Sequence, residues 1–196
     1  MKSVLVLYCS LRGHTARVAR RICAAVVAAG GKADMMELKE AVHEGIQWRD
    51  YDVVVLGAPV IYGTYDKEML RFVAANKAQL DAKPNSFFNV SVVARTPAKA
   101  TVTGNRYMQK FLELSPWKPR DLKVIAGKVD YPAWPWYAVI MIQLIMQMTH
   151  GPTDRKAVID YTNWDDVDAY GRHVLTLGAG AERAANERPV SEVIPQ

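Results

Sequence analysis

The sequence predicts an α/β protein in which parallel strands form one doubly wound sheet. Three observations predict this class. Several apolar runs have the length of a strand and no polar gap, which is typical of strands buried on both faces of a parallel sheet. Segments with a helical spacing of apolar residues lie between these runs, and the two kinds of segment alternate along the chain. The 196 residues, of which 50% are hydrophobic, suffice for one domain with a substantial core.

The first half of the chain supplies three of the five expected strands. Residues 3–8 are continuously apolar, and residues 15–29 carry apolar side chains at helical spacing before two glycines end that helix. Residues 33–38 form a shorter and less apolar strand, which we expect nearer an edge of the sheet. The run YDVVVLG, residues 51–57, is the third strand.

The second half of the chain continues the alternation. After a helix over residues 66–80 comes the strand SFFNVSVV, residues 86–93. After a helix over residues 103–114 comes the strand LKVIAGKV, residues 122–129, and a helix over residues 164–177 is last. Five such strands suit the flavodoxin-like order 2-1-3-4-5, whose ligand binds beyond the carboxyl ends of strands 1 and 3.

Two stretches do not fit this alternation. Residues 130–162 lie between the fifth strand and the last helix, and a structureless loop of that length is uncommon in a compact domain, so we expect this insert to have a function. Residues 178–196 are rich in Ala, Gly, Glu and Arg, and we expect a mobile tail. The predicted organisation is therefore a single domain over residues 1–177, with the insert inside it, followed by the tail.

The turn after the first strand, SLRGHT at residues 10–15, predicts an anion site. It opens the first helix, where backbone N–H groups have no intrahelical partner and the helix dipole favours negative charge. Gly13 lets the backbone approach a ligand, the hydroxyls of Ser10 and Thr15 can donate to phosphate oxygens, and Arg12 adds charge. The structural alternative is that Thr15 caps the helix and Ser10 closes the turn.

Other nucleotide-binding motifs are absent from the sequence. It contains no Gly-x-Gly-x-x-Gly and no Gly-x-x-x-x-Gly-Lys-Ser/Thr, so neither a dinucleotide fingerprint nor a P-loop is indicated. A response regulator needs acidic residues at the ends of strands 1 and 3, where this chain has Cys9 and Ser10, then Gly57 and Ala58.

Three loops of this chain resemble the flavin-binding loops of flavodoxins. The turn at 10–15 is similar to the flavodoxin phosphate loop Thr-x-Thr-Gly-x-Thr, and the strand-3 exit GAPVIYG resembles the loop that packs against the isoalloxazine ring. The strand-4 exit, residues 92–96, is where a third loop would contact the other side of the ring. Tyr62 is the candidate for stacking on the flavin, or else it covers the sheet end. The cofactor-binding residues that this resemblance implies are Ser10, Leu11, Arg12, Gly13, His14, Thr15, Ala58, Pro59, Val60, Ile61, Tyr62, Gly63, Val92, Val93, Ala94 and Arg95.

A closer resemblance covers residues 1–177. The stretches IYGTYDKEMLRFV, FFNVSVVARTPAKATVTGN and YTNWDDV, and most specifically the insert, resemble the bacterial menaquinone-dependent protoporphyrinogen oxidases, which are FMN enzymes of haem biosynthesis with a long-chain flavodoxin fold. The resemblance implies oxidation of protoporphyrinogen IX to protoporphyrin IX, six electrons in three two-electron steps, with the electrons passed to menaquinone or ubiquinone. It implies FMN as the cofactor and gives no catalytic acid or base.

Two other functions stay open at this point. A flavodoxin-like NAD(P)H:quinone oxidoreductase would share FMN and the quinone but would be reduced by NADPH. A non-catalytic flavodoxin-type electron carrier would turn over only beside a reductase. Nucleic-acid binding is not expected, because it would depend on charge alone without any motif.

The insert has the composition of a surface that meets lipid. Residues 131–153 contain no Asp, Glu, Lys or Arg, and basic residues flank them. The apolar part, residues 136–149, is too short to span a bilayer of about 30 Å, whereas aromatic residues and basic flanks suit a membrane–water boundary. We expect this apolar part to be a helix, and its burial against its own domain or in a homo-oligomer interface is the alternative. The resemblance favours a peripheral membrane role or a porphyrin and quinone pocket. The candidate substrate or membrane residues are Arg95, Tyr131, Trp134, Trp136, Tyr137 and His150.

The charge of the chain favours an anionic partner. The formal net charge is +5, and residues 95–128 alone carry about +6. Arg95, at the exit of strand 4, is the candidate for a contact with a substrate propionate, with FMN or a local acid as the alternative partner. His150 is a candidate proton acceptor or a polar helix terminus.

The cysteines and the amino terminus bear on the compartment. Cys9 and Cys23 have no paired or metal-ligand spacing, so we expect reduced core thiols, no metal site and no disulfide. We expect no secretory signal, because Lys2 is followed by an apolar run of strand length and then by charge. Together with the insert, the resemblance to the oxidases implies a peripheral protein on the cytoplasmic face of the inner membrane.

Overall fold

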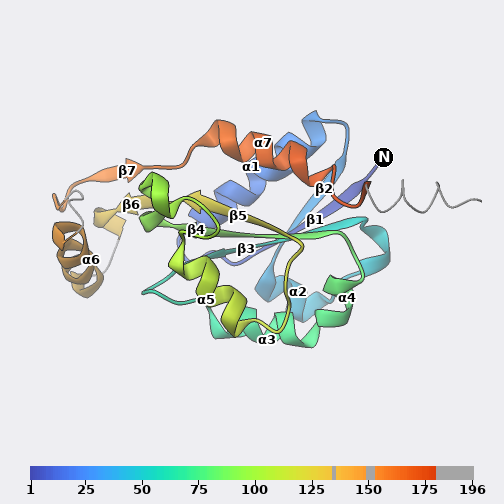
Figure 1. Cartoon of the computed structure of the whole chain (residues 1–196), viewed down its shortest axis with the longest axis horizontal. Coiled ribbons are helices and arrows are strands. Elements are labelled where there is room, and N and C mark those ends of the chain that lie inside the picture. Colours follow the sequence, from blue (N-terminus) through green and yellow to red (C-terminus); the bar gives the residue numbers. More distant parts are fainter. Residues whose placement is uncertain (134–135, 149–152, 180–196) are drawn as a thin grey trace, which may run out of the picture.

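A computed structural model of the chain describes residues 1–133, 136–148 and 153–179. Its main sheet is parallel with the order β2-β1-β3-β4-β5, which confirms the predicted fold class (Figure 1). The strands are β1 (Ser3–Tyr8), β2 (Lys32–Glu37), β3 (Val53–Pro59), β4 (Asn85–Ser91), β5 (Asp121–Ala126), β6 (Lys128–Asp130) and β7 (Val158–Asp160).

Helices cover both faces of this sheet: α1 (His14–Ala28), α2 (Leu38–Glu44), α3 (Lys67–Ala75), α4 (Lys77–Asp81), α5 (Arg106–Leu114) and α7 (Trp164–Val174). A further helix, α6 (Trp136–Met148), belongs to the insert. In Figure 1, α1 and α7 lie on one face and α2 to α5 on the other. Strand residues alternate between the two layers, because Val4 and Val6 join the cluster under α1 and α7 while Leu5 and Leu7 join the opposite one.

Several predicted boundaries are wrong for local reasons. The helix expected over residues 66–80 is two helices, because the chain turns at Asn76, whose side chain donates to the Phe72 carbonyl at 3.0 Å. The helix expected from residue 103 begins at Arg106, because the Asn105 side chain accepts from two amides of the first turn and caps it there. Strand 4 ends at Ser91 and continues as the short 3-10 helix η2 (Val92–Arg95).

The fifth predicted strand, residues 122–129, is also wrong in extent. It breaks at Gly127, whose amide donates to the Ser91 carbonyl at 3.1 Å, and β6 leaves the main sheet. β6 pairs antiparallel with β7, with Lys128 opposite Asp160. These two paired strands connect the insert to the core domain. α6 lies beyond them at one end of the molecule, at the left of Figure 1.

The predicted insert helix is confirmed as α6, which has 13 residues. None of the described helices combines the length and apolar character that a transmembrane crossing needs. Within the described part of the chain, Cys9 and Cys23 are free thiols, and burial raises the pKa of Cys9 to about 12. Trp134, His150 and residues 180–196 of the predicted tail lie outside the described residues.

Candidate functional site

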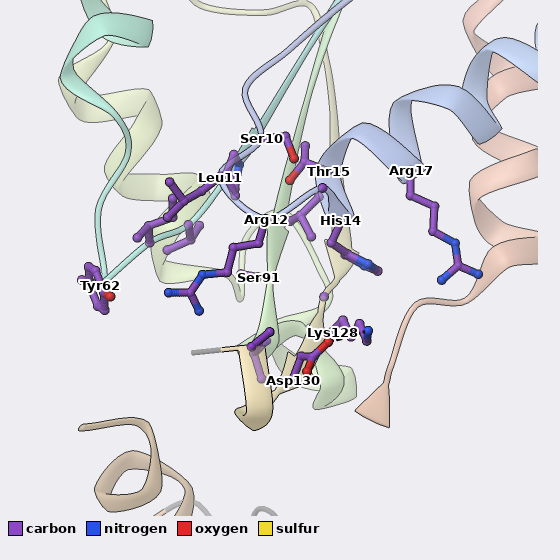
Figure 2. A pocket seen from close by; sticks show the side chains of 18 of the residues that line it. Ser10, Leu11, Arg12, His14, Thr15, Arg17, Tyr62, Ser91, Lys128 and Asp130 are labelled. Atoms are coloured by element: carbon purple, nitrogen blue, oxygen red, sulfur yellow. Dashed lines mark hydrogen bonds and ion pairs between the residues drawn. The ribbon is translucent and has the colours of Figure 1, made fainter. Parts of the chain in front are cut away.

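A cavity of about 440 Å³ opens at the carboxyl ends of β1, β3 and β4 (Figure 2). This volume lies in the range of small-molecule sites, and the position is the one where doubly wound sheets bind ligands. The lining residues come from the turn after β1, the exits of β3 and β4, and the insert: Ser10, Leu11, Arg12, Gly13, His14, Thr15, Arg17, Pro59, Val60, Ile61, Tyr62, Val90, Ser91, Val92, Gly127, Lys128, Asp130, Ala133 and Ile142.

The turn after β1 has the geometry of an anion site. Gly13 is the N-cap of α1 with a left-handed φ of 78°, a conformation that glycine adopts at little cost. The Ser10 hydroxyl accepts from the amide of Ala16 at 3.3 Å. Among the described residues, no hydrogen bond occupies the backbone amides of Gly13, His14 or Thr15. These amides and the positive end of the α1 dipole can hold a phosphate.

His14 lies in this turn, but its side chain is directed at the far end of the insert. Its Nε2 atom lies 2.9 Å from the Thr162 hydroxyl and 3.9 Å from an Asp160 carboxylate oxygen. Burial lowers the pKa of His14, against the opposing effect of Asp160. The Thr162 hydroxyl donates to the Ala126 carbonyl at 2.8 Å. His14 therefore lines the cavity while its Nε2 atom anchors the turn to the insert.

Arg17 strengthens the same junction from one turn further along α1. Its guanidinium lies 4.4 Å from the centre of the Trp164 ring and 3.4 Å from the Asp160 carboxylate. Burial opposes ionisation of Asp160, but the hydrogen bonds from Thr162 hold its pKa below the usual range. The junction thus joins α1 to the point where the chain returns from the insert.

Tyr62 lies at the tip of a tight turn after β3. Both central residues have positive φ, 48° at Tyr62 and 77° at Gly63, as in a type I′ turn. Ile61 and Thr64 exchange backbone hydrogen bonds of 2.9 and 3.0 Å across it, and Lys110 donates to the Gly63 carbonyl at 2.9 Å. The half-exposed Tyr62 ring lines the cavity on the side away from His14 and Arg17, where it can stack on a planar ligand (Figure 2).

Of the predicted third loop, residues 92–96, only the first residue lines the cavity. Val92 lines the cavity, together with Val90 and Ser91 before it. Val93, Ala94 and Arg95 are not among the described lining residues, and Ala94 is buried in the core. Arg95 donates to the Val92 carbonyl at 3.4 Å. Ala58 and Gly63 of the second loop also lie outside the lining, so the roles predicted for these five residues stay predictions.

The predicted substrate or membrane residues of the insert separate into two groups. Tyr131 is 1% exposed and packs with Val129, Val139 and Met146 in the core of the insert. Trp136 and Tyr137 at the start of α6 are 76% and 56% exposed. The structure does not bring these three residues into the cavity lining.

Sequence reasoning did not identify the residues in and next to the insert that line the cavity. Lys128 and Asp130 of β6 line it, as do Ala133 and Ile142. The available signal was the i, i+2 spacing of the two charges, which places them on one face of a strand. Within the described part of the chain, no three His, Cys, Asp or Glu side chains gather as metal ligands.

The sequence of this chain is similar to those of known proteins. Residues 5–156 match the flavodoxin domain family. The chain is 36% identical over 173 residues to protoporphyrinogen IX dehydrogenase (quinone) of Escherichia coli strain K12, covering 88% of this chain and 94% of that protein. It is 34% identical over 174 residues to the protein of the same name from Leishmania major, covering 88% of this chain and 74% of that protein. Among solved structures, oxidised flavodoxin 1 from Bacillus cereus aligns over 89% of this chain and 97% of its own, at 15% identity and a TM-score of 0.47.

Proposed function

This chain belongs to the flavodoxin domain family and, within it, to the protoporphyrinogen IX dehydrogenases (quinone), and we propose that it uses FMN to oxidise protoporphyrinogen IX and passes the electrons to a quinone. The family consists of oxidoreductases, and the flavodoxin domain implies a flavin cofactor. The observation that carries the proposal is that one cavity joins an anion-binding turn to the wall of the insert.

The residues of the cavity fit FMN. The amides at the start of α1 and the hydroxyls of Ser10 and Thr15 would hold one phosphate, and Tyr62 would cover one face of the isoalloxazine ring. The site has one such helix terminus and no dinucleotide motif, which favours the mononucleotide. When bound, the flavin supplies two-electron oxidation chemistry, and the protein supplies binding, orientation and electrostatics.

The substrate and acceptor come from the names of the relatives. Three two-electron steps convert protoporphyrinogen IX to protoporphyrin IX, which is a step of haem biosynthesis. The apolar side chains of Ala133 and Ile142 give the cavity a wall suited to a large hydrophobic ring, and the same wall suits the ring of menaquinone or ubiquinone.

We further propose that α6 rests on the cytoplasmic face of the inner membrane. Trp136, Tyr137, Ile140 and Leu144 expose 76%, 56%, 44% and 58% of their surface. Arg155 lies beside them, since its Nε atom donates to the Gln143 side chain at 3.2 Å. A helix of 13 residues is about 20 Å long, shorter than the bilayer core of about 30 Å, so it suits the interface and not a crossing. A lipid-soluble quinone would be available there.

Anaerobic turnover tests the proposal. FMN-loaded protein is mixed with protoporphyrinogen IX, and porphyrin fluorescence is followed before and after a menaquinone analogue is added. We expect fluorescence to grow to many turnovers only with the quinone. Quinone reduction driven by NADPH without a response to porphyrinogen would instead assign an NAD(P)H:quinone oxidoreductase. Turnover only with a separate reductase would assign an electron carrier.

A further inference from the structure

Ser91 is a cavity residue whose hydroxyl hydrogen is not used within the described part of the chain. It is the last residue of β4, and it lines the cavity although only 4% of its surface is exposed. Among the described residues, its hydroxyl takes part in one hydrogen bond, in which it accepts from the Asn105 side chain. A hydroxyl also has one hydrogen to donate, and a buried donor without an acceptor is unfavourable. The Ser91 hydrogen is therefore available to a ligand in the cavity.

The orientation of the Asn105 side chain determines which of its atoms faces Ser91. Asn105 is fully buried and is the N-cap of α5. Its Oδ1 atom accepts from the backbone amides of Tyr107 and Met108 at 3.1 and 3.0 Å, which an amide nitrogen in that position could not do. The Nδ2 group is therefore turned the other way, where it donates to the Lys99 carbonyl at 2.8 Å and to the Ser91 hydroxyl at 3.5 Å. Because Asn105 presents a donor, the Ser91 hydroxyl cannot donate back to it.

Two further buried side chains hold Asn105 in this orientation. Asn89, two residues before Ser91 on β4, donates to Asn105 Oδ1 at 3.3 Å. The same Asn89 amide donates to the Tyr65 hydroxyl at 3.0 Å, and Tyr65 donates to the Tyr107 carbonyl at 2.9 Å. Buried networks of this kind fix the positions of their members. Of these five residues, Ser91 is the one that lines the cavity, so the network ends at the ligand site.

Ser91 lies too far from the phosphate turn to meet a phosphate bound there. Neighbouring strands of a sheet are about 4.8 Å apart, so the end of β4, two strands from β1, lies about 10 Å across the sheet from that turn. The turn after β3, which carries Tyr62, lies between them. Helix α5 supports this turn as well, because Lys110 donates to the Gly63 carbonyl at 2.9 Å. With a phosphate at the turn after β1, Ser91 therefore meets the ring end of FMN.

We propose that the Ser91 hydroxyl donates a hydrogen bond to a carbonyl oxygen of the isoalloxazine ring, and that Asn105 is the residue that positions this hydroxyl. The inference rests on the proposed function, because it needs FMN in the cavity. Reduction adds electrons to the ring, and a hydrogen bond to an acceptor of greater negative charge is stronger. A donor fixed beside that oxygen therefore stabilises the reduced form more than the oxidised form. Ser91 should raise the midpoint potential of the bound FMN.

The midpoint potential of FMN-loaded protein tests the role of Ser91. It is measured without oxygen, by absorbance of the bound flavin in equilibrium with a redox dye of known potential. Ser91→Ala is expected to lose about tenfold in its preference for reduced over oxidised FMN, which for a two-electron couple lowers the potential by about 30 mV. Its affinity for oxidised FMN, followed by quenching of flavin fluorescence, is expected to fall by no more than about threefold.

Asn105→Ser separates positioning from helix capping. Serine caps a helix about as well as asparagine but has no amide to donate to Ser91, so we expect about a threefold loss of the same preference, or about 15 mV. In the Ser91→Ala background, Asn105→Ser should cause no further shift, because it acts through the Ser91 hydroxyl. Asn163→Ser is the control and is expected to keep the wild-type potential. Asn163 caps α7, where it accepts from the Asp166 amide at 3.1 Å, and it is not among the described lining residues.

Two results would overturn the inference alone. One is Ser91→Ala protein whose bound FMN has an unchanged or higher midpoint potential. The other is Asn105→Ser that lowers the potential equally with and without the Ser91 hydroxyl, which would mean that it acts through a general disturbance of α5. Wild-type protein that binds no FMN would overturn the proposed cofactor and this inference together, so the two failures are distinguishable.

Discussion

The Nε2 atom of His14 lies 2.9 Å from the hydroxyl oxygen of Thr162, although 148 positions separate the two residues in the chain. His14 is the first residue of α1, and Thr162 follows the last strand of the insert. The turn proposed to hold the FMN phosphate is thus joined to the ladder that carries α6. This contact lets the core domain and the insert enclose one cavity.

The same contact predicts a pH-dependent stability. Burial lowers the pKa of His14, so the folded protein binds the proton less readily than the unfolded chain, whose histidine titrates near the ordinary value of 6.5. The stabilisation that His14 contributes to the folded protein is complete above pH 6.5 and declines as the pH falls below it. Urea unfolding at about pH 7.5 and about pH 5.5 measures this stabilisation. We expect the free energy of unfolding to fall more between the two pH values for the wild type than for His14→Gln. An equal fall in unfolding free energy for the wild type and His14→Gln would show that His14 does not contribute this stabilisation.

The left-handed conformation of Gly13 predicts a specific cost of substitution. Gly13→Ala is expected to lose about 1 kcal/mol of unfolding free energy and to weaken FMN binding, because the new side chain disfavours φ of +78° although its Cβ meets no atom within 4 Å. Gly30→Ala is the control. Gly30 has φ of +87°, an equally open Cβ position and no place in the cavity lining, so its variant should lose stability and keep its FMN affinity. Equal FMN affinities for the two variants would show that the turn does not depend on this backbone shape.

Tyr62 is predicted to stack on the flavin. Removal of its ring in Tyr62→Ala is expected to weaken FMN binding about tenfold, whereas Tyr62→Phe keeps the ring and is expected to bind within about twofold of the wild type. Quenching of FMN fluorescence on binding measures both affinities. Weak binding by Tyr62→Phe would mean that the hydroxyl group, and not the ring, makes the contact.

The exposed face of α6 predicts binding to membranes. The double substitution Trp136→Ser and Leu144→Ser is expected to lower sedimentation with anionic phospholipid vesicles at least tenfold, since burial of large apolar side chains supplies about 1.5 to 3 kcal/mol each. Val27→Ser is the control, because Val27 is an exposed apolar residue of α1, in the core domain. Unchanged sedimentation of the α6 variant would indicate that this face meets protein and not lipid.

The main sheet could be predicted from the sequence because its signal is local. Each of the first four strands lies within a few residues of its predicted position, since a strand buried on both faces needs an uninterrupted apolar run. Gly13 and its flanking hydroxyl residues also predict their turn without knowledge of the rest of the chain. α2 was missed because it is short and buries only Leu38 and Ala41, which gives no clear apolar period.

The insert side of the site could not be predicted because its geometry depends on distant contacts. Residues 122–129 form one apolar-rich run, and nothing within it shows that β6 leaves the main sheet to pair with β7, about 30 residues later. Lys128 and Asp130 face the cavity only through that pairing. Arg95 was chosen for its place after strand 4, but the chain turns into η2 there, and Arg95 is not among the described residues that line the cavity.

The central claim is that one cavity brings a flavin and a porphyrinogen together, and anaerobic stopped-flow absorbance of the bound flavin tests it most directly. FMN-loaded wild-type protein is mixed with protoporphyrinogen IX without a quinone. The account predicts bleaching of the flavin, with three flavins reduced for each protoporphyrin formed. A flavin that stays oxidised with protoporphyrinogen but bleaches with NADPH would contradict it.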